Sequence, residues 1–102
     1  MSFRPTARLG DRTHGVCYAH DSPLTVGGTI ITASPNVFTN NRGTARIGDI
    51  VLADCGHQSS IITGSPTVLA NNRLVARIGD KTDGSPYDAE IITASPDTFK
   101  EP

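Results

Sequence analysis

Apolar and polar residues alternate along this chain in short stretches, and each stretch is bounded by turn-forming residues. Residues 6–9, 30–32 and 37–39 place small or apolar side chains in alternation with polar ones, which is typical of half-buried strands. Apolar residues do not recur at helical spacing over more than one turn. The pattern therefore predicts an all-β fold built from short strands.

The same sequence words recur along the chain. Ala-Arg-X-Gly-Asp and Ile-Ile-Thr-X-Ser-Pro each occur three times, and Asn-Asn-Arg occurs twice. These words lie at residues 7–11, 45–49 and 76–80, at residues 30–35, 61–66 and 91–96, and at residues 40–42 and 71–73. Because they recur in one order with a period of about 31 residues, they predict a repeat architecture.

Two Asn-Asn pairs mark predicted hairpin turns. Asn tolerates the left-handed backbone region better than most residues, so Asn40-Asn41 and Asn71-Asn72 are suited to the centre of a tight turn. The strand segments that these turns would pair are residues 37–39 with 44–47 and residues 67–69 with 75–78.

The two ends of the chain complement each other. Residues 95–99 form a Ser-Pro-X-X-Phe segment with no Ala-Arg-X-Gly-Asp word after it, and the first such word, at residues 7–11, has no strand before it. If residues 97–99 pair with residues 6–9, the chain holds three equivalent hairpins. We therefore predict one pseudo-threefold domain closed by its own ends. The domain spans residues 1–102, with repeats of about residues 6–43, 44–74 and 75–102.

Composition limits how such a domain is stabilised. The chain has 102 residues, of which 36% are hydrophobic and none is Trp, so its core is thin. Small domains with weak cores are often stabilised by a disulfide or a metal ion. The net charge of −1 gives no general attraction to nucleic acid or to an anionic membrane. No signal peptide opens the chain, so we expect synthesis in the cytoplasm.

The Arg and Asp of each Ala-Arg-X-Gly-Asp word are spaced to form an ion pair. We expect solvated pairs at the rim of the molecule, each contributing about 0–1 kcal/mol. A network between the repeats is the alternative. The three pairs are Arg8 with Asp11, Arg46 with Asp49, and Arg77 with Asp80.

Possible metal ligands are concentrated in two segments. Three segments join Gly-Asp to Ile-Ile-Thr, at residues 12–29, 50–60 and 81–90, and we expect them to be loops at one end of the molecule. All the His and Cys residues lie in the first two: His14, Cys17, His20, Cys55 and His57. Such a cluster predicts bound zinc, which favours four nitrogen or sulfur ligands, with iron as a less favoured choice. A Cys17–Cys55 disulfide is the main rival, and a reducing compartment disfavours it.

The repeated words resemble those of the PAAR-repeat family, named for Pro-Ala-Ala-Arg. The resemblance covers residues 6–99 and rests on Ala-Arg-X-Gly-Asp, Gly-Ser-Pro-X-Val and the paired-Asn turns. This chain departs from the family by having Thr-Ala-Arg or Val-Ala-Arg in place of Pro-Ala-Ala-Arg, and Asn-Asn in place of Asn-Gly. The resemblance implies an all-β cone with threefold-like symmetry and a metal ion near its point.

The resemblance also implies a ligand set for the metal. Thr13-His14-Gly15 matches a Thr-X-His-Gly word of the family, and Cys55-Gly56-His57 matches a Cys-X-His word. His20 has a weaker match because the first segment is expanded here, and Cys17 competes with it. The implied ligands are His14, His20, Cys55 and His57, with Cys17 as the alternative.

The function that the resemblance implies is mechanical. Such cones cap the trimeric β-helical spike (the valine-glycine-repeat protein VgrG, or its phage equivalent) of type VI secretion systems and contractile phage tails. One cap would serve one trimer, contact the target membrane transiently as it pierces, and travel outward with the spike, with an effector as a further cargo. The sequence does not distinguish a phage tail from a secretion system.

A threefold partner requires equivalent apolar positions on the cap. The Ile-Ile pairs supply them, and because neighbouring side chains of a strand face opposite ways, one set would be buried and the other free for docking. The positions are Ile30, Ile31, Ile61, Ile62, Ile91 and Ile92. The alternative functions are a zinc-stabilised adaptor without a piercing role and, less favoured, a zinc hydrolase. We expect no enzyme, because four ligands leave no open position on the metal.

Overall fold

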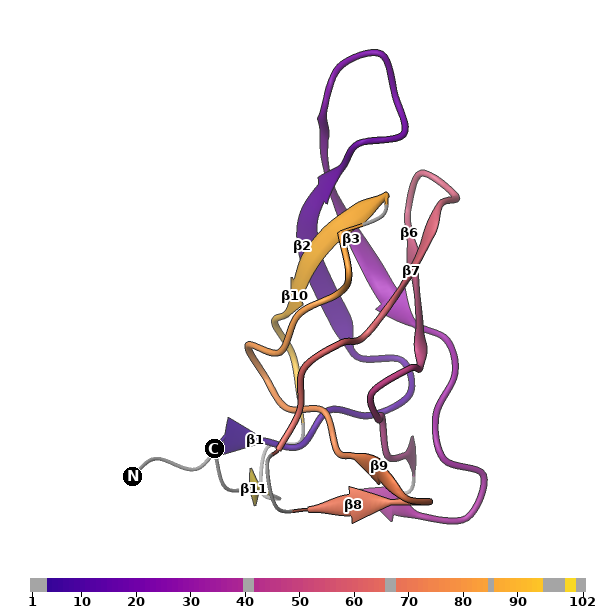
Figure 1. The fold of residues 1–102 in the computed structure, drawn as a ribbon, viewed down its shortest axis with the longest axis vertical. Coiled ribbons are helices and arrows are strands. Elements are labelled where there is room, and N and C mark those ends of the chain that lie inside the picture. Colours follow the sequence, from indigo (N-terminus) through magenta and orange to yellow (C-terminus); the bar gives the residue numbers. More distant parts are fainter. Residues whose placement is uncertain (1–3, 40–41, 66–67, 85, 95–98, 101–102) are drawn as a thin grey trace.

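The computed structural model describes residues 4–39, 42–65, 68–84, 86–94 and 99–100. All regular structure in these residues is β-strand, and none of them forms a helix, so the predicted all-β fold class is confirmed. No helix among them could cross a membrane. The molecule measures 38 × 29 × 23 Å and is drawn out along one axis, with a narrow and a broad end (Figure 1).

Eleven strands are present in the described residues. Their bounds are β1 Arg4–Pro5, β2 Arg12–Cys17, β3 Leu24–Ile30, β4 Phe38–Thr39, β5 Arg42–Gly43, β6 Ile50–Ala53, β7 Gln58–Ser60, β8 Leu69–Ala70, β9 Arg73–Leu74, β10 Tyr87–Ile91 and β11 Phe99–Lys100.

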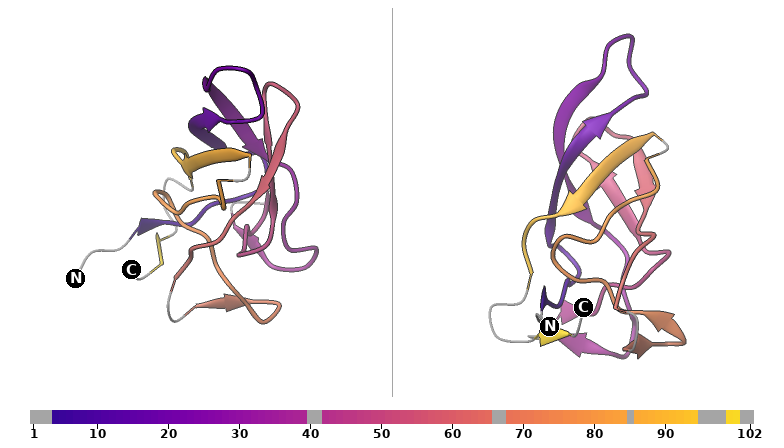
Figure 2. Two further views of the ribbon diagram at one scale, coloured as in Figure 1. Left: turned by 45° about the horizontal axis from the view of Figure 1, so that its top comes forward. Right: turned by 60° about the vertical axis from the view of Figure 1, so that its left-hand side comes forward.

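The five longest strands form one curled antiparallel sheet. Its order is β10-β2-β3-β6-β7. The segment before β10 lies between the two edges of this sheet, because Thr82 bridges to Ile61 beyond β7 and Lys81 bridges to Glu90 of β10. The sheet therefore curls around a common interior, which the two turned views show (Figure 2).

The three segments predicted as loops contain strands, so that prediction was wrong: two of them are hairpins, and residues 81–90 include most of β10. Residues 12–29 contain β2 and β3, paired from Arg12↔Thr29 to Cys17↔Leu24, and residues 50–60 contain β6 and β7. Gly27 and Gly28 lie within β3, where Gly28 is needed for close packing. A Cβ there would lie 2.9 Å from the Tyr87 ring and 2.7 Å from the Thr13 hydroxyl.

The core fills the interior of the curled sheet. Ile30, Ile61 and Ile91 are fully buried, whereas the Ile that follows each of them is exposed. Tyr87 is also fully buried, and its hydroxyl hydrogen-bonds with the Thr13 hydroxyl and donates to the Val26 carbonyl. Of the six predicted docking positions, Ile31, Ile62 and Ile92 are therefore exposed, and their role in docking stays a prediction.

Three two-stranded sheets form the broad end, where both chain ends lie (Figures 1 and 2). In β8–β9, Asn71 and Asn72 adopt φ of 53° and 64°, which confirms the predicted tight turn. Asn40 and Asn41 lie outside the described residues, but the strands on either side of them pair as β4–β5.

The chain ends pair with each other at the broad end. The register is Arg4↔Lys100 and Pro5↔Phe99. This pairing lies next to the predicted one between residues 6–9 and 97–99, and residues 97 and 98 are outside the described part of the chain. Strand β1 is thus held by the last strand of the chain.

Backbone hydrogen bonds join the three Ala-Arg-X-Gly-Asp words into a ring. The amide of Ala7 donates to the carbonyl of Ala76 (3.0 Å), that of Ala45 to Ala7 (3.0 Å), and that of Ala76 to Ala45 (2.9 Å). All three alanines are fully buried. The ring therefore joins the three repeated words. The predicted threefold relation among whole repeats and the predicted repeat boundaries stay predictions.

The three predicted Arg–Asp pairs form, but the expectation that they are solvated was wrong. Arg46 donates to both oxygens of Asp49 at 2.9 Å, and Asp49 also accepts the Arg46 amide at 2.7 Å. Both residues are buried, and this hydrogen bonding raises the pKa of Arg46. The Thr32 hydroxyl of the first predicted repeat donates to Asp49 of the second at 3.0 Å, and the Thr63 hydroxyl of the second donates to Asp80 of the third at 2.8 Å. The carboxylates of the pairs are therefore buried and connected between repeats, which matches the alternative interpretation.

Candidate metal centre

Four side chains gather where two hairpins end near the narrow end of the molecule (Figure 1). Cys17 is the last residue of β2, and His20 lies in the turn between β2 and β3. Cys55 and His57 lie in the turn between β6 and β7. One sulfur or nitrogen atom from each side chain lies within 4.8 Å of the others, so the two hairpins meet at this group.

Contacts within the group centre on His57. Its Nδ1 lies 3.5 Å from the Cys55 sulfur and 3.6 Å from the Cys17 sulfur. The rings of His20 and His57 meet edge to face, with centroids 5.0 Å apart and planes at 82°. Each of the four side chains therefore contacts another member of the group.

Solvent exposure increases from one side of the group to the other. Cys17 is fully buried, Cys55 and His57 are half-buried, and His20 is exposed. Burial raises the pKa of Cys17, whereas the hydrogen bond with His57 lowers the pKa of Cys55. The two thiols thus differ because one is desolvated by the core and the other has a polar neighbour.

The donor set fits a zinc-type metal ion. With zinc–sulfur distances of about 2.3 Å and zinc–nitrogen distances of about 2.0–2.1 Å, the corners of a tetrahedron lie roughly 3.3–3.8 Å apart. The four atoms here are within 4.8 Å of one another, so a small contraction would bring them to that spacing. Both cysteines are free, so no disulfide competes in this structure. Two thiols and two imidazoles could hold a metal here.

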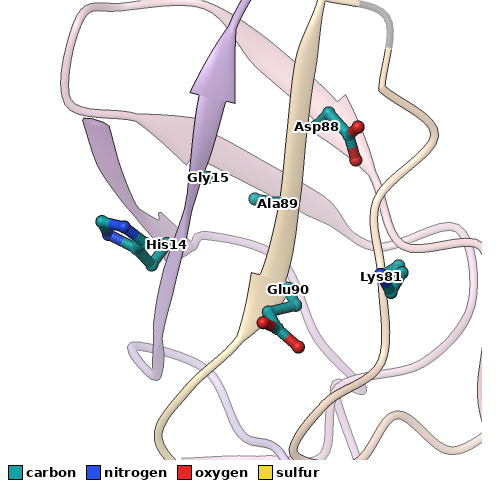
Figure 3. Close-up of a pocket in the computed structure, with 6 residues that line it drawn as sticks. All are labelled: His14, Gly15, Lys81, Asp88, Ala89 and Glu90. Atoms are coloured by element: carbon teal, nitrogen blue, oxygen red, sulfur yellow. The ribbon is translucent and has the colours of Figure 1, made fainter. Parts of the chain in front are cut away.

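His14 is not brought into this group. Side chains of a strand alternate between its faces, and Thr13 and Cys17 of β2 are buried while His14 is exposed. His14 therefore lies on the other face of β2 from Cys17. It borders an open polar hollow on the outside of the sheet together with Gly15, Lys81, Asp88, Ala89 and Glu90 (Figure 3).

Of the implied ligands, the structure brings together His20, Cys55 and His57 and adds Cys17. The sequence-based interpretation treated Cys17 and His20 as competitors, whereas both lie in the group. The strand periodicity of residues 13–17 could have revealed this, because it separates His14 from Cys17. That signal was missed because the segment was expected to be a loop.

An ion pair supports the turn that carries Cys55. Arg12 of β2 donates to Asp54 at 2.8 Å, and the Asp54 amide donates to the Gly27 carbonyl at 2.8 Å. The hydrogen bond from Arg12 lowers the pKa of Asp54 and raises that of Arg12. These contacts hold the β6–β7 turn against β3, so Cys55 is positioned by the sheet beneath it.

Comparison with known families identifies the PAAR motif over residues 20–85 of the chain. The match begins at His20 and includes Cys55 and His57. No curated protein matches the chain significantly. Because the match covers more than half of the 102 residues, the chain belongs to the PAAR-motif family.

Proposed function

We propose that Cys17, His20, Cys55 and His57 bind one structural zinc ion. The four donors come from two hairpins, so the ion would cross-link the β2–β3 and β6–β7 turns. Binding energy would then add to the stability of a domain whose core is thin. This proposal replaces His14 with Cys17 in the ligand set, since His14 lies on the opposite face of β2. Iron is the less favoured ion because two thiols and two imidazoles suit tetrahedral zinc.

We infer that the protein caps the trimeric β-helical spike of a contractile injection apparatus. The observation that carries this inference is the PAAR motif over residues 20–85. The molecule supports it with a narrow end near which the Cys and His side chains gather and a broad end built from three small sheets (Figure 1). The buried ring of Ala7, Ala45 and Ala76 joins the three repeated words inside the molecule, so one chain would present three similar segments to a threefold partner.

The broad end carries the apolar surface that such a spike would cover. Phe38 of β4 and Leu69 of β8 lie in its small sheets and are 63% and 58% exposed. Ile31, Ile62 and Ile92, which follow β3, β7 and β10 of the curled sheet, are exposed as well. The open end of a β-helix presents unpaired strand edges and apolar side chains, which favour aggregation unless they are covered. A cap that covers them needs no reaction chemistry, and four ligands would fill the shell of the zinc ion. We therefore propose a structural, non-catalytic protein, made in the cytoplasm and delivered outward on the spike.

Mixing the protein with a purified trimeric spike protein tests this function. We expect a stable complex of one cap with three spike chains, measured by size-exclusion chromatography with light scattering. A Phe38→Asp/Leu69→Asp variant should bind at least about tenfold more weakly, because it places charge in an apolar interface. Tyr18→Asp is the matched control, since Tyr18 is 55% exposed but follows β2 near the other end.

Binding to a spike trimer decides between the cap and the zinc-stabilised adaptor. Failure to bind spike trimers of both secretion and phage origin would overturn the cap assignment and favour the zinc-stabilised adaptor. Binding that the Tyr18 variant loses and the broad-end variant keeps would show that the docking surface lies at the narrow end instead.

A further inference from the structure

The two cysteines of the chain lie together although they belong to different hairpins. Cys17 ends β2, Cys55 follows β6, and the chain has no other Cys. Their sulfur atoms are within 4.8 Å of each other, and both thiols are free. A disulfide has a sulfur–sulfur distance of about 2.05 Å, so a short movement separates the present arrangement from a covalent bond.

The surroundings indicate which cysteine moves. Cys17 is fully buried and pairs with Leu24 on one side and Tyr87 on the other, so the sheet fixes its backbone. Cys55 is half-buried in a turn and is followed by Gly56. A Cβ added to Gly56 would meet no atom within 4 Å, so this turn borders open space. Cys55 lies in a turn that borders open space, so a movement of its side chain toward Cys17 would disturb the sheet less than the reverse movement.

We propose that Cys17 and Cys55 are a redox-reversible pair, in which a peroxide forms an intramolecular disulfide and releases the metal ion. The inference rests on the proposed zinc site, because both cross-links use the same two sulfur atoms and exclude each other. In either state the β2–β3 and β6–β7 hairpins stay joined. Oxidation would exchange one cross-link at the narrow end for another.

The chemistry needs the two cysteine thiolates that would bind zinc, a peroxide and two protons from solvent. The half-buried Cys55 thiolate attacks hydrogen peroxide, the oxygen–oxygen bond breaks, and Cys55 becomes a sulfenic acid while the departing hydroxide takes a proton from solvent to form water. The Cys17 thiolate then attacks the Cys55 sulfur, the sulfur–oxygen bond breaks, and the departing hydroxide takes a second proton to form a second water. Overall, two thiolates, one peroxide and two protons give one disulfide and two waters. A bound metal ion would lose two of its four ligands and would leave with its oxidation state unchanged.

A protein that travels outward on a spike meets the conditions for this exchange. Thiols remain reduced in the cytoplasm, which favours the metal-bound state, and disulfides persist outside it. A cross-link that survives the change of compartment would keep the narrow end ordered in both. The pair therefore gives the molecule a second means of holding the same two hairpins.

The test treats the full-length zinc-loaded protein with an equimolar amount of hydrogen peroxide. A chromophoric chelator measures released zinc, and mass spectrometry of a non-reduced tryptic digest identifies linked peptides. We expect about one zinc released per disulfide formed, a linked pair of peptides containing Cys17 and Cys55, and full reversal by a thiol reductant with added zinc. Cys17→Ser and Cys55→Ser are the controls, since neither can form the intramolecular bond.

Each outcome decides one of the two proposals. Separate sulfinic acids on the two cysteines, or disulfides between chains, would overturn the redox pair while leaving the zinc site intact. Unreactive thiols in a zinc-loaded protein would also overturn the redox pair and leave the zinc site intact. If the purified protein contains no metal and the Cys17–Cys55 bond still forms, the zinc site fails and the redox pair stands without its coupling to metal release.

Discussion

Replacing Cys55 by Ala is expected to release the metal ion and to lower the melting temperature by about 10–20 °C. Cys55 and His57 are the proposed ligands from the β6–β7 turn, while Cys17 and His20 are those from the β2–β3 hairpin. Removal of Cys55 leaves a single ligand from the second hairpin, so the cross-link between the hairpins weakens. Metal content by mass spectrometry and thermal unfolding by circular dichroism measure the two effects.

His14→Ala is the matched control for this experiment. His14 is exposed on the other face of β2, so the variant should keep its metal and melt within about 2 °C of the unchanged protein. Wild-type protein stripped by a chelator should melt close to the Cys55→Ala variant, which separates metal loss from a packing defect. Loss of metal in His14→Ala would instead support the ligand set that the family resemblance implies.

Asp49→Ala is expected to reduce the free energy of unfolding by about 3–5 kcal/mol, because it leaves a buried guanidinium without its partner. Asp49 accepts three hydrogen bonds from Arg46 and one from the Thr32 hydroxyl at 3.0 Å. Such a loss is a large fraction of the roughly 5–15 kcal/mol that stabilises a typical domain. Urea unfolding followed by circular dichroism measures it.

Two further variants make this prediction specific. Asp88→Ala removes an exposed carboxylate of β10 and should change stability by less than about 0.5 kcal/mol. Arg46→Met/Asp49→Leu removes both buried charges and should be more stable than Asp49→Ala, because no unpaired charge remains. If Asp49→Ala changed the free energy of unfolding as little as Asp88→Ala does, the buried ion pairs would contribute no more to stability than the solvated pairs expected from the sequence.

Local sequence chemistry predicted the fold class and several of its details. Asn71 and Asn72 adopt the positive φ values that their side chains tolerate, and the three-residue spacing of Arg46 and Asp49 brings the two together. The sequence spacing of two residues does not determine how deeply their side chains are buried, however. The burial of this pair depends on neighbours such as Thr32, which belongs to another copy of the repeated words.

The two hairpins at the narrow end were harder to predict because their stability comes from distant partners. Strand β2 contains His14 and Gly15, which have little preference for strands, but it pairs along its length with β3 and in part with β10. A side chain at Gly15 would collide with the backbone of β10, 2.0 Å from the Asp88 carbonyl oxygen. A single sequence window contains none of these contacts.

The sequence predicted the type of site, a metal-binding group, but not all of its residues. The concentration of His and Cys in two segments predicted a metal group, and His20, Cys55 and His57 do lie together. Cys17 and His14 differ in their position along β2, which places them on opposite faces. Choosing between them required knowing that residues 12–17 form a strand.

X-ray absorption at the zinc edge of the purified protein tests the metal centre most directly. We expect one zinc per chain with two sulfur neighbours at about 2.3 Å and two nitrogen neighbours at about 2.0–2.1 Å. Protein purified without metal, or a zinc ion with one sulfur and three nitrogen neighbours, would contradict the assignment of Cys17, His20, Cys55 and His57 as its ligands.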